Sequence, residues 1–357
     1  MIKRNDPLLD LCRCFRGEIP AGLEWMSIIE LANRTLTTPA LVACAEQCPD
    51  TIPRDVDAYL KEIFQRNLAR NERLSFQLNE AIAALNAQGI VPVLMKGSAL
   101  LAERGDAFRR RIISDLDILV SPDETLRALK CLSGLGYRIH HLMPHGAARW
   151  HADLHRPEDV GMVDLQQSPP GHAFFYRTSG DLKRHCHLNV NDKISAYIPD
   201  PTFQALMLIM HDQFQDSDYW TGHVDLRHLL DLRDLATSPG GIDWQRLASL
   251  APSRLARNAL ETQLVALHAW LGVDVPAEMR HRLIPKLQQW RRRFQSRVPA
   301  LRTAFLPMML LDFRSYRAEI GAEERATNQL KPKWSFPKAS SIRYFYGLAN
   351  KNPVGKI

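Results

Sequence analysis

The sequence predicts an α/β (α+β) fold, in which a small mixed sheet of four or five strands carries helices on one face. An N-terminal helical segment precedes this sheet and a C-terminal helical domain follows it. Three observations support the fold class. A long segment with apolar residues at helical spacing comes before residue 89, short apolar runs typical of buried strands follow it, and helices succeed one another beyond about residue 200.

The length of 357 residues allows two or more compact units. We expect an N-terminal helical segment at 1–88, a core unit with the sheet at 89–198, a helical domain at 199–328 and a basic arm at 329–357. The apolar runs are far shorter than the ~20 residues of a membrane-spanning helix. The N-terminus does not resemble a signal peptide, and the six cysteines form no Cys-x-x-Cys pair. These features predict a soluble, cytoplasmic protein with free thiols.

The first element to stand out is a long helix. Prolines divide residues 1–53 into short helices. From Asp55 to Gln88 apolar residues then recur at helical intervals without Pro or Gly, and Gly89 is placed to end the helix. One continuous helix therefore leads into the core unit.

The core unit begins with the order strand, tight turn, helix. Ile90–Met95 is a short apolar run, Lys96-Gly97-Ser98 is the turn, and 99–104 can form a helix. The remaining predicted elements are a buried strand at Ile112–Val120, an amphipathic helix ending near Gly134 or Gly136, a strand at Tyr137–His141, and a hairpin of Trp150–His155 with Met162–Gln167.

Helical patterns dominate the rest of the chain. The predicted helices run from Pro201 to about Phe214, from Val224 to Leu235, from Ser253 to Leu271 and from Pro276 to Phe294.

Two aspartates mark the strand at Ile112–Val120. Because side chains alternate along a strand, Asp115 and Asp117 point to one face while Leu116 and Ile118 point into the core. Adjacent carboxylates repel each other unless a cation compensates, and hard oxygen ligands of this kind suit Mg²⁺ held together with substrate phosphates. The strand therefore predicts a divalent metal site.

The turn before it predicts an anion site. A helix that starts at Gly-Ser offers backbone N–H groups, a hydroxyl and the positive end of the helix dipole. Gly97 also lets the backbone approach a phosphate closely, and Ser98 supplies the hydroxyl. Neither the Gly-Ser turn nor the pair of aspartates is a strong signal alone, because a Gly-Ser after a strand is usually only a turn. The two motifs nevertheless lie in one unit.

Together these motifs resemble the DNA polymerase beta-like nucleotidyltransferase superfamily, whose signature is an apolar residue, Gly-Gly or Gly-Ser, and a later Asp-x-Asp or Asp-x-Glu. The closer resemblance is to a bacterial group of mostly uncharacterised nucleotidyltransferases with Lys-Gly before the helix and Arg-x-x-x-Asp-x-Asp-x-Leu-Val after it. Here these are Lys96-Gly97 and the segment from Arg111 to Val120. The resemblance covers roughly residues 60–240, including the helical stretch with His211 and Asp231.

The resemblance implies transfer of a nucleoside monophosphate from a nucleoside triphosphate to an acceptor, with pyrophosphate leaving. It implies two Mg²⁺ ions held by Asp115, Asp117 and a third carboxylate, for which Asp164 is the candidate. Gln166 stands where many members have His, and the spacing between Gly-Ser and Asp-x-Asp is longer than in compact members of the superfamily.

The same resemblance assigns the triphosphate to Lys96, Gly97, Ser98 and Arg111. Lys96 and Arg111 could balance phosphate charge, or could equally neutralise the Asp pair as structural residues. The acceptor, the base and the oligomeric state stay open.

Several histidines invite a zinc interpretation that their spacing does not support. His151 and His155 lie four residues apart on a predicted strand, where one face repeats at about 13 Å, too far for one ion. His185-Cys186-His187 has no second ligand pair at zinc-site spacing. His211 lies on an apolar helix and is more typical of a core or cleft histidine than of a catalytic one.

The net charge of +7 is concentrated at one end of the chain. Residues 280–357 hold 17 Lys and Arg against 4 Asp and Glu, a balance of +13. A run such as Arg291-Arg292-Arg293 is usually a solvated helix face, but with interleaved aromatics it could bind an anionic acceptor or nucleic acid. The alternative to an enzyme is therefore a non-catalytic protein that binds nucleotides or nucleic acid on the same fold.

Overall fold

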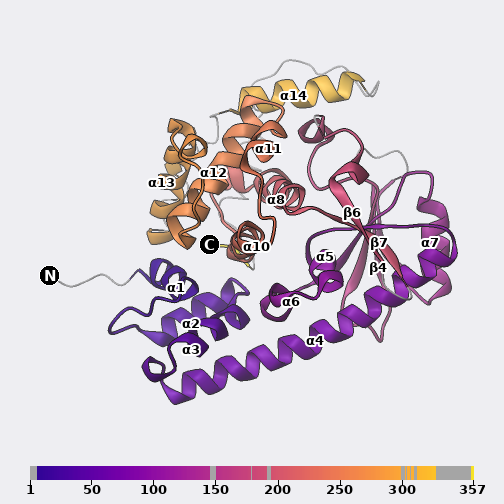
Figure 1. Cartoon of the computed structure of the whole chain (residues 1–357). Coiled ribbons are helices and arrows are strands. Elements are labelled where there is room, and N and C mark those ends of the chain that lie inside the picture. The colour runs from indigo at the N-terminus through magenta and orange to yellow at the C-terminus, as the bar shows by residue number, and fades with distance from the viewer. Residues whose placement is uncertain are drawn as a thin grey trace.

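The computed structural model (Figure 1) describes residues 6–144, 150–177, 179–190, 194–298, 302, 304–305, 307–308, 312–326 and 355–357. Most of the predicted basic arm at 329–357 lies outside the described residues, which resume only at Gly355.

Helices account for most of the described chain. They are α1 (Pro7–Phe15), α2 (Trp25–Arg34), α3 (Val42–Gln47), α4 (Arg54–Ala87), α5 (Lys96–Glu103), α6 (Asp106–Arg110), α7 (Thr125–Gly134), α8 (Pro201–Met210), α9 (Asp218–Thr221), α10 (Leu226–Thr237), α11 (Trp244–Ser249), α12 (Arg254–Leu271), α13 (Leu283–Arg297) and α14 (Phe313–Ala326). No helix in this part of the chain is long and apolar enough to cross a membrane.

One mixed sheet forms the centre of the core unit, in the strand order β3-β4-β5-β2-β1-β7-β6. Its strands are β1 (Val93–Leu94), β2 (Asp115–Leu119), β3 (Arg138–Leu142), β4 (His151–His155), β5 (Met162–Gln166), β6 (Cys186–Val190) and β7 (Ser195–Pro199). The mixed sheet and its helical flanks are confirmed, but the prediction of four or five strands is wrong. The two strands it missed, β6 and β7, form a hairpin whose strand β7 pairs parallel to β1.

The 34-residue helix α4 runs along one side of the sheet (Figure 1), as its uninterrupted apolar pattern predicts. The second half of α4 packs with α7 against the apolar side chains of the strands, among them Ile118, Val163 and Leu154. These side chains are fully buried. Along each strand they alternate with polar residues, which therefore point to the opposite face. One face of β2, β5 and β4 thus belongs to the apolar core, and the opposite face carries the polar side chains.

The helical domain shares its core with the N-terminal helices. One continuous apolar cluster joins residues of α1 and α2 to residues of α8, α10 and α12. In Figure 1 these early and late helices lie side by side, and α1 contacts α12. The N-terminal segment therefore supports the helical domain as well as the sheet.

Several predicted helices differ from the structure at their ends. Helix α5 begins at Lys96, so the predicted turn Lys96-Gly97-Ser98 is its first turn, and α10 begins and ends two residues later than predicted. The helix from Pro201 ends at Met210 and continues as a π-helical turn, His211–Gln215, and α13 begins at Leu283 rather than at Pro276. Such π turns widen the backbone by one residue and often occur at functional sites.

Candidate functional site

Three carboxylates lie in a row across neighbouring strands, on the face of the sheet opposite α4. Asp117 of β2 is the register partner of Asp164 of β5, and Asp164 is the partner of Asp153 of β4. Adjacent strands are about 4.8 Å apart, so the three side chains project from one face at neighbouring positions. The predicted hairpin pairs Asp164 with Asp153, and the parallel pairing of β5 with β2 brings Asp164 beside Asp117.

Lys96 supplies the cation in this row. It follows β1 at the first position of α5, and its Nζ lies 2.8 Å from Oδ1 of Asp117. Burial alone would lower the pKa of Lys96, but the carboxylates of Asp117 and Asp115 outweigh it and hold this pKa above its ordinary value. Lys96 also has a φ of 46°, an uncommon conformation for a residue other than Gly. The turn is thus constrained so that the lysine meets Asp117.

Gln166 joins the two central carboxylates. Its Nε2 donates to Oδ1 of Asp117 at 3.1 Å and to Oδ2 of Asp164 at 2.6 Å. The other oxygen of Asp164, Oδ1, is buried without a hydrogen-bond partner among the described residues. Burial, with the nearby charge of Asp117, raises the pKa of Asp164 to about 7. The site therefore holds more negative charge than Lys96 alone compensates.

Asp115 lies at the edge of this group. It shares the face of Asp117 on β2, two residues earlier, and its Oδ1 accepts a hydrogen bond of 2.7 Å from Ser114 Oγ. Among the described residues, the one set of three possible ligands that gather within 4.8 Å lies elsewhere. Asp115, Asp117 and Asp164 are thus neighbours that do not converge on one point, and Asp117 and Asp164 form the closer pair.

The Gly-Ser turn packs tightly against the segment that precedes β2. A Cβ on Gly97 would lie 2.7 Å from Cγ2 of Ile113, so no larger residue fits without displacing Ile113. Ser98 is fully buried, and its Oγ has no hydrogen-bond partner in the described part of the chain. An unsatisfied buried hydroxyl costs stability, which is typical of a group kept for a ligand.

Arg111 does not contact the Asp pair. Its Nε lies 3.0 and 2.9 Å from the two carboxylate oxygens of Asp231 on α10. Both side chains are almost completely buried. Arg111 therefore connects the segment that leads into β2 to the helical domain.

Buried amides on α4 hold the segments that enter the two carboxylate strands. Asn71 Nδ2 donates to the carbonyls of Phe108 and Arg111, at 2.7 and 2.8 Å, before β2. Gln77 Nε2 donates to the carbonyl of Gly161 at 2.8 Å, immediately before β5. One rigid helix thus sets the positions of both strands.

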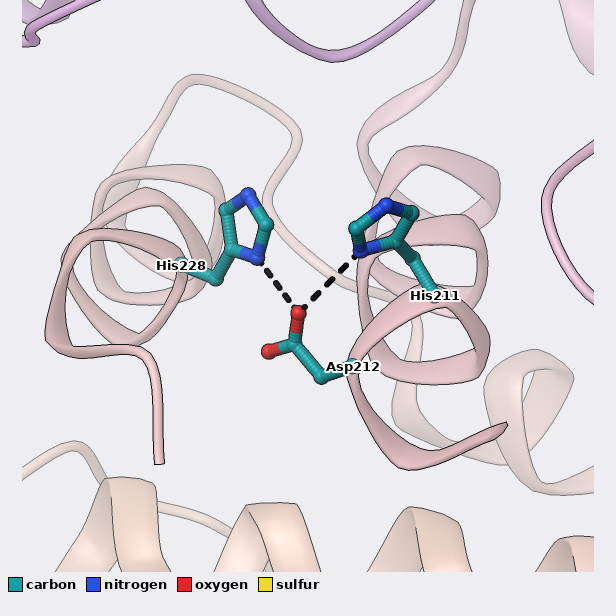
Figure 2. Close-up of side chains that lie close together, drawn as sticks. All are labelled: His211, Asp212 and His228. Atoms are coloured by element: carbon teal, nitrogen blue, oxygen red, sulfur yellow. Dashed lines mark hydrogen bonds and ion pairs between the residues drawn. The ribbon is translucent and has the colours of Figure 1, made fainter. Parts of the chain in front are cut away.

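A second cluster lies in the helical domain. His211 and Asp212 in the π turn face His228 of α10 (Figure 2), with Nδ1 of His228 2.5 Å from Oδ1 of Asp212 and Nδ1 of His211 3.5 Å from the same oxygen. Burial would lower the pKa of His228, but Asp212 and Asp225 outweigh it and raise this pKa. Burial and the charge of Lys96 lower the pKa of His211.

The charges of this cluster are paired within the protein. His228 lies within ion-pair distance of two carboxylates, those of Asp212 and Asp225. Asp212 Oδ2 already accepts a hydrogen bond of 3.2 Å from Gln263. The cluster therefore anchors the π turn, and it places His211 close enough to Lys96 and Asp117 to influence both electrostatically.

The basic run on α13 is not a solvated face. Arg291 and Arg292 are buried: Arg291 donates to the carbonyls of Tyr219 and Trp220, and Arg292 to the amide oxygens of Gln213 and Gln263. Both interpretations of this run, a solvated face or a nucleic-acid surface, are therefore wrong for these two residues.

The end of the basic arm is also bound to the fold. Lys356 Nζ lies 2.8 Å from both Asp216 and Asp218, and Ile357 exchanges backbone hydrogen bonds with Val224. The aromatic residues predicted to interleave with the arm's charge, Trp334, Tyr344 and Phe345, lie outside the described residues.

A cavity of about 360 Å³ opens beside Asp164. The polar face of β4 and β5 forms its floor, with His151, Asp153 and Gln166, and Trp150 and Gln215 add walls. Gln215 is the last residue of the π turn, so residues of the core unit and of the helical domain both line the cavity. The histidines His151 and His155 lie on strand β4, as predicted.

Sequence reasoning missed several of these features. It did not include Asp212, and it did not include His228, which becomes a neighbour of His211 only when α8 and α10 pack together. It also missed Trp150 and Asp153 as cavity residues, although Asp153 alternates with Ala152 and Leu154 along the predicted strand before Asp164. The buried amides of α4 could not be predicted, because the helix is recognised from the spacing of its apolar residues.

Comparison with known proteins gives one match. The model of a family described as an uncharacterised nucleotidyltransferase matches residues 21–272. This span includes Lys96, the carboxylate row and the cluster around Asp212. No curated protein and no solved structure matches the chain.

Proposed function

This chain belongs to the uncharacterised nucleotidyltransferase family, and we propose that it transfers a nucleoside monophosphate from a nucleoside triphosphate to the hydroxyl group of an acceptor, with release of pyrophosphate. The observation that carries the proposal is the pairing of Asp117 with Asp164 on adjacent strands, one strand away from the turn that begins at Lys96. The orphaned Oδ1 of Asp164 supports it, because a buried carboxylate oxygen without a donor suits a cation.

We further propose that Asp115, Asp117 and Asp164 hold Mg²⁺, with two ions. The donor set fits, since all three offer hard carboxylate oxygens on one face of the sheet and their charge exceeds that of Lys96. Bound Mg²⁺ would neutralise charge on the phosphates and on the attacking and leaving oxygens.

The turn at the start of α5 would bind the triphosphate. Gly97 offers its backbone N–H, Ser98 its unpartnered hydroxyl and Lys96 a cation next to the carboxylates. Arg111 remains a proposed phosphate contact only if the triphosphate draws it away from Asp231.

The reaction requires a base near the acceptor. The acceptor oxygen attacks the α-phosphorus, the bond from that phosphorus to the bridging oxygen breaks, and pyrophosphate leaves. We propose that Asp164 takes the hydroxyl proton; its position next to Asp117 and at the border of the cavity supports this role.

The direct experiment is a transfer assay. The protein is incubated with each α-labelled ribonucleoside triphosphate, Mg²⁺ and a cell extract, and the label is traced. We expect label on a new product together with pyrophosphate release. Tight triphosphate binding without label transfer would contradict the proposal and favour the non-catalytic nucleotide-binding alternative.

A further inference from the structure

We propose that the cavity beside Asp164 binds the acceptor, and that this acceptor is a small molecule with a positively charged group as well as a hydroxyl. The inference rests on the proposed function and specifies its second substrate. It replaces the anionic acceptor that the net charge of the C-terminal region predicts.

The place of the cavity in the sheet supports an acceptor site. In the strand order, β1 and the phosphate turn lie on one side of β2, whereas β5 and β4 lie on the other. The cavity lies over β5 and β4. Two substrates bound at the turn and in the cavity would therefore meet at Asp117 and Asp164 from opposite sides.

The lining of the cavity selects for positive charge. Asp153 and Asp164 both border it, and no Lys or Arg lies among the described residues that do. Asp153 has no hydrogen bond or ion pair to its side chain within the described residues, although it is partly buried. Because Asp164 is assigned to Mg²⁺ and to the hydroxyl proton, Asp153 is the carboxylate left to meet the rest of the acceptor. A phosphorylated or polyanionic acceptor would face this unpaired charge, whereas an ammonium group would give Asp153 a partner.

The size and apolar walls favour a small molecule. A volume of about 360 Å³ is at the lower end of the range of small-molecule sites. Met143 and Pro170 contribute apolar surface to the lining of the cavity.

The reaction balances without a further reactant. The acceptor hydroxyl forms the new bond to the α-phosphorus, pyrophosphate leaves with the electron pair of the broken bond, and the proton passes to Asp164. The charged group of the acceptor does not react and stays against Asp153.

The test identifies the charge of the labelled acceptor. A whole cell extract is incubated with the protein and the four α-labelled triphosphates, and the labelled conjugate is purified. Phosphodiesterase then splits the conjugate into labelled nucleoside monophosphate and the unlabelled acceptor, which is followed by mass spectrometry through a small-molecule filter and ion exchange at pH 7. We expect the acceptor to pass a small-molecule filter and to bind a cation exchanger. A released acceptor that is neutral, anionic or macromolecular would overturn this inference alone, whereas failure of any label to transfer would contradict the proposed function itself.

A substitution and a competition experiment test whether Asp153 binds the positive charge of the acceptor. Asp153→Asn should raise the KM for the labelled acceptor roughly tenfold, while Asp123→Asn, which removes an exposed carboxylate outside the cavity, serves as the charge-matched control. In the wild type, D-glucosamine should inhibit transfer more strongly than D-glucose or D-glucose 6-phosphate, and Asp153→Asn should abolish this order. Equal inhibition by all three in the wild type, or an unchanged KM in Asp153→Asn, would contradict recognition of a cation by Asp153.

Discussion

Replacing Asp164 by Asn should lower the turnover of nucleotidyl transfer by about 10²–10⁴-fold, the usual effect of removing a general base. Loss of a metal ligand would add to this effect. The substitution removes a buried carboxylate whose pKa is already raised to about 7, so the variant should fold. Because the base acts mainly in the transition state, kcat should fall far more than triphosphate affinity.

Asp153→Asn is the matched comparison, since Asp153 is the cross-strand partner of Asp164 on the same face. Its loss should raise the acceptor KM and change kcat much less than Asp164→Asn does. Initial rates of pyrophosphate release over a range of acceptor concentrations separate the two effects. If Asp153→Asn proves inactive while Asp164→Asn turns over almost normally, the third carboxylate is Asp153 and the assignment of roles on the hairpin is wrong.

Breaking the ion pair between Arg111 and Asp231 should destabilise the protein by about 3–5 kcal/mol, because either single substitution leaves an uncompensated buried charge. Arg111→Met and Asp231→Leu should each show this loss, and the double variant should recover much of it. The pair joins the segment before β2 to α10, so the expected role of Arg111 is mainly structural.

Urea unfolding of the two single variants and the double variant measures the coupling free energy, and calorimetry measures triphosphate affinity in each. A phosphate-binding role for Arg111 predicts a different pattern. In that case Asp231→Leu would be nearly as stable as the wild type, and Arg111→Met would lose triphosphate affinity without losing stability.

The parts of the site predicted from the sequence are those with a strong local pattern. Asp115 and Asp117 alternate with Leu116 and Ile118, which fixes the face of β2 on which each lies. The same alternation around Asp164, together with a turn before β5, predicts the hairpin that the structure shows. The position of Lys96 just after a strand is predicted from the apolar run that forms this strand.

The features that could not be predicted from the sequence depend on contacts with residues far away in the chain. Strand β6 has exposed side chains, including Leu188 and Val190, and obtains its place only by pairing with β7, so no apolar run marks it. Burial of Arg291 and Arg292 requires carbonyl and amide oxygens some 30–80 residues earlier in the chain, which a local charge count cannot show.

The central claim is that the carboxylates of β2 bind a nucleoside triphosphate through Mg²⁺. Asp115 tests it best, because its described side-chain contact is one hydrogen bond from Ser114, whereas Asp117→Asn would leave Lys96 buried without its partner. Isothermal titration of each ribonucleoside triphosphate, with and without Mg²⁺, compares the wild type with Asp115→Asn and with Asp123→Asn as control. The account predicts binding that requires Mg²⁺ and is weakened about tenfold or more in Asp115→Asn alone. Binding of equal strength with and without Mg²⁺, and equal in all three proteins, would contradict it.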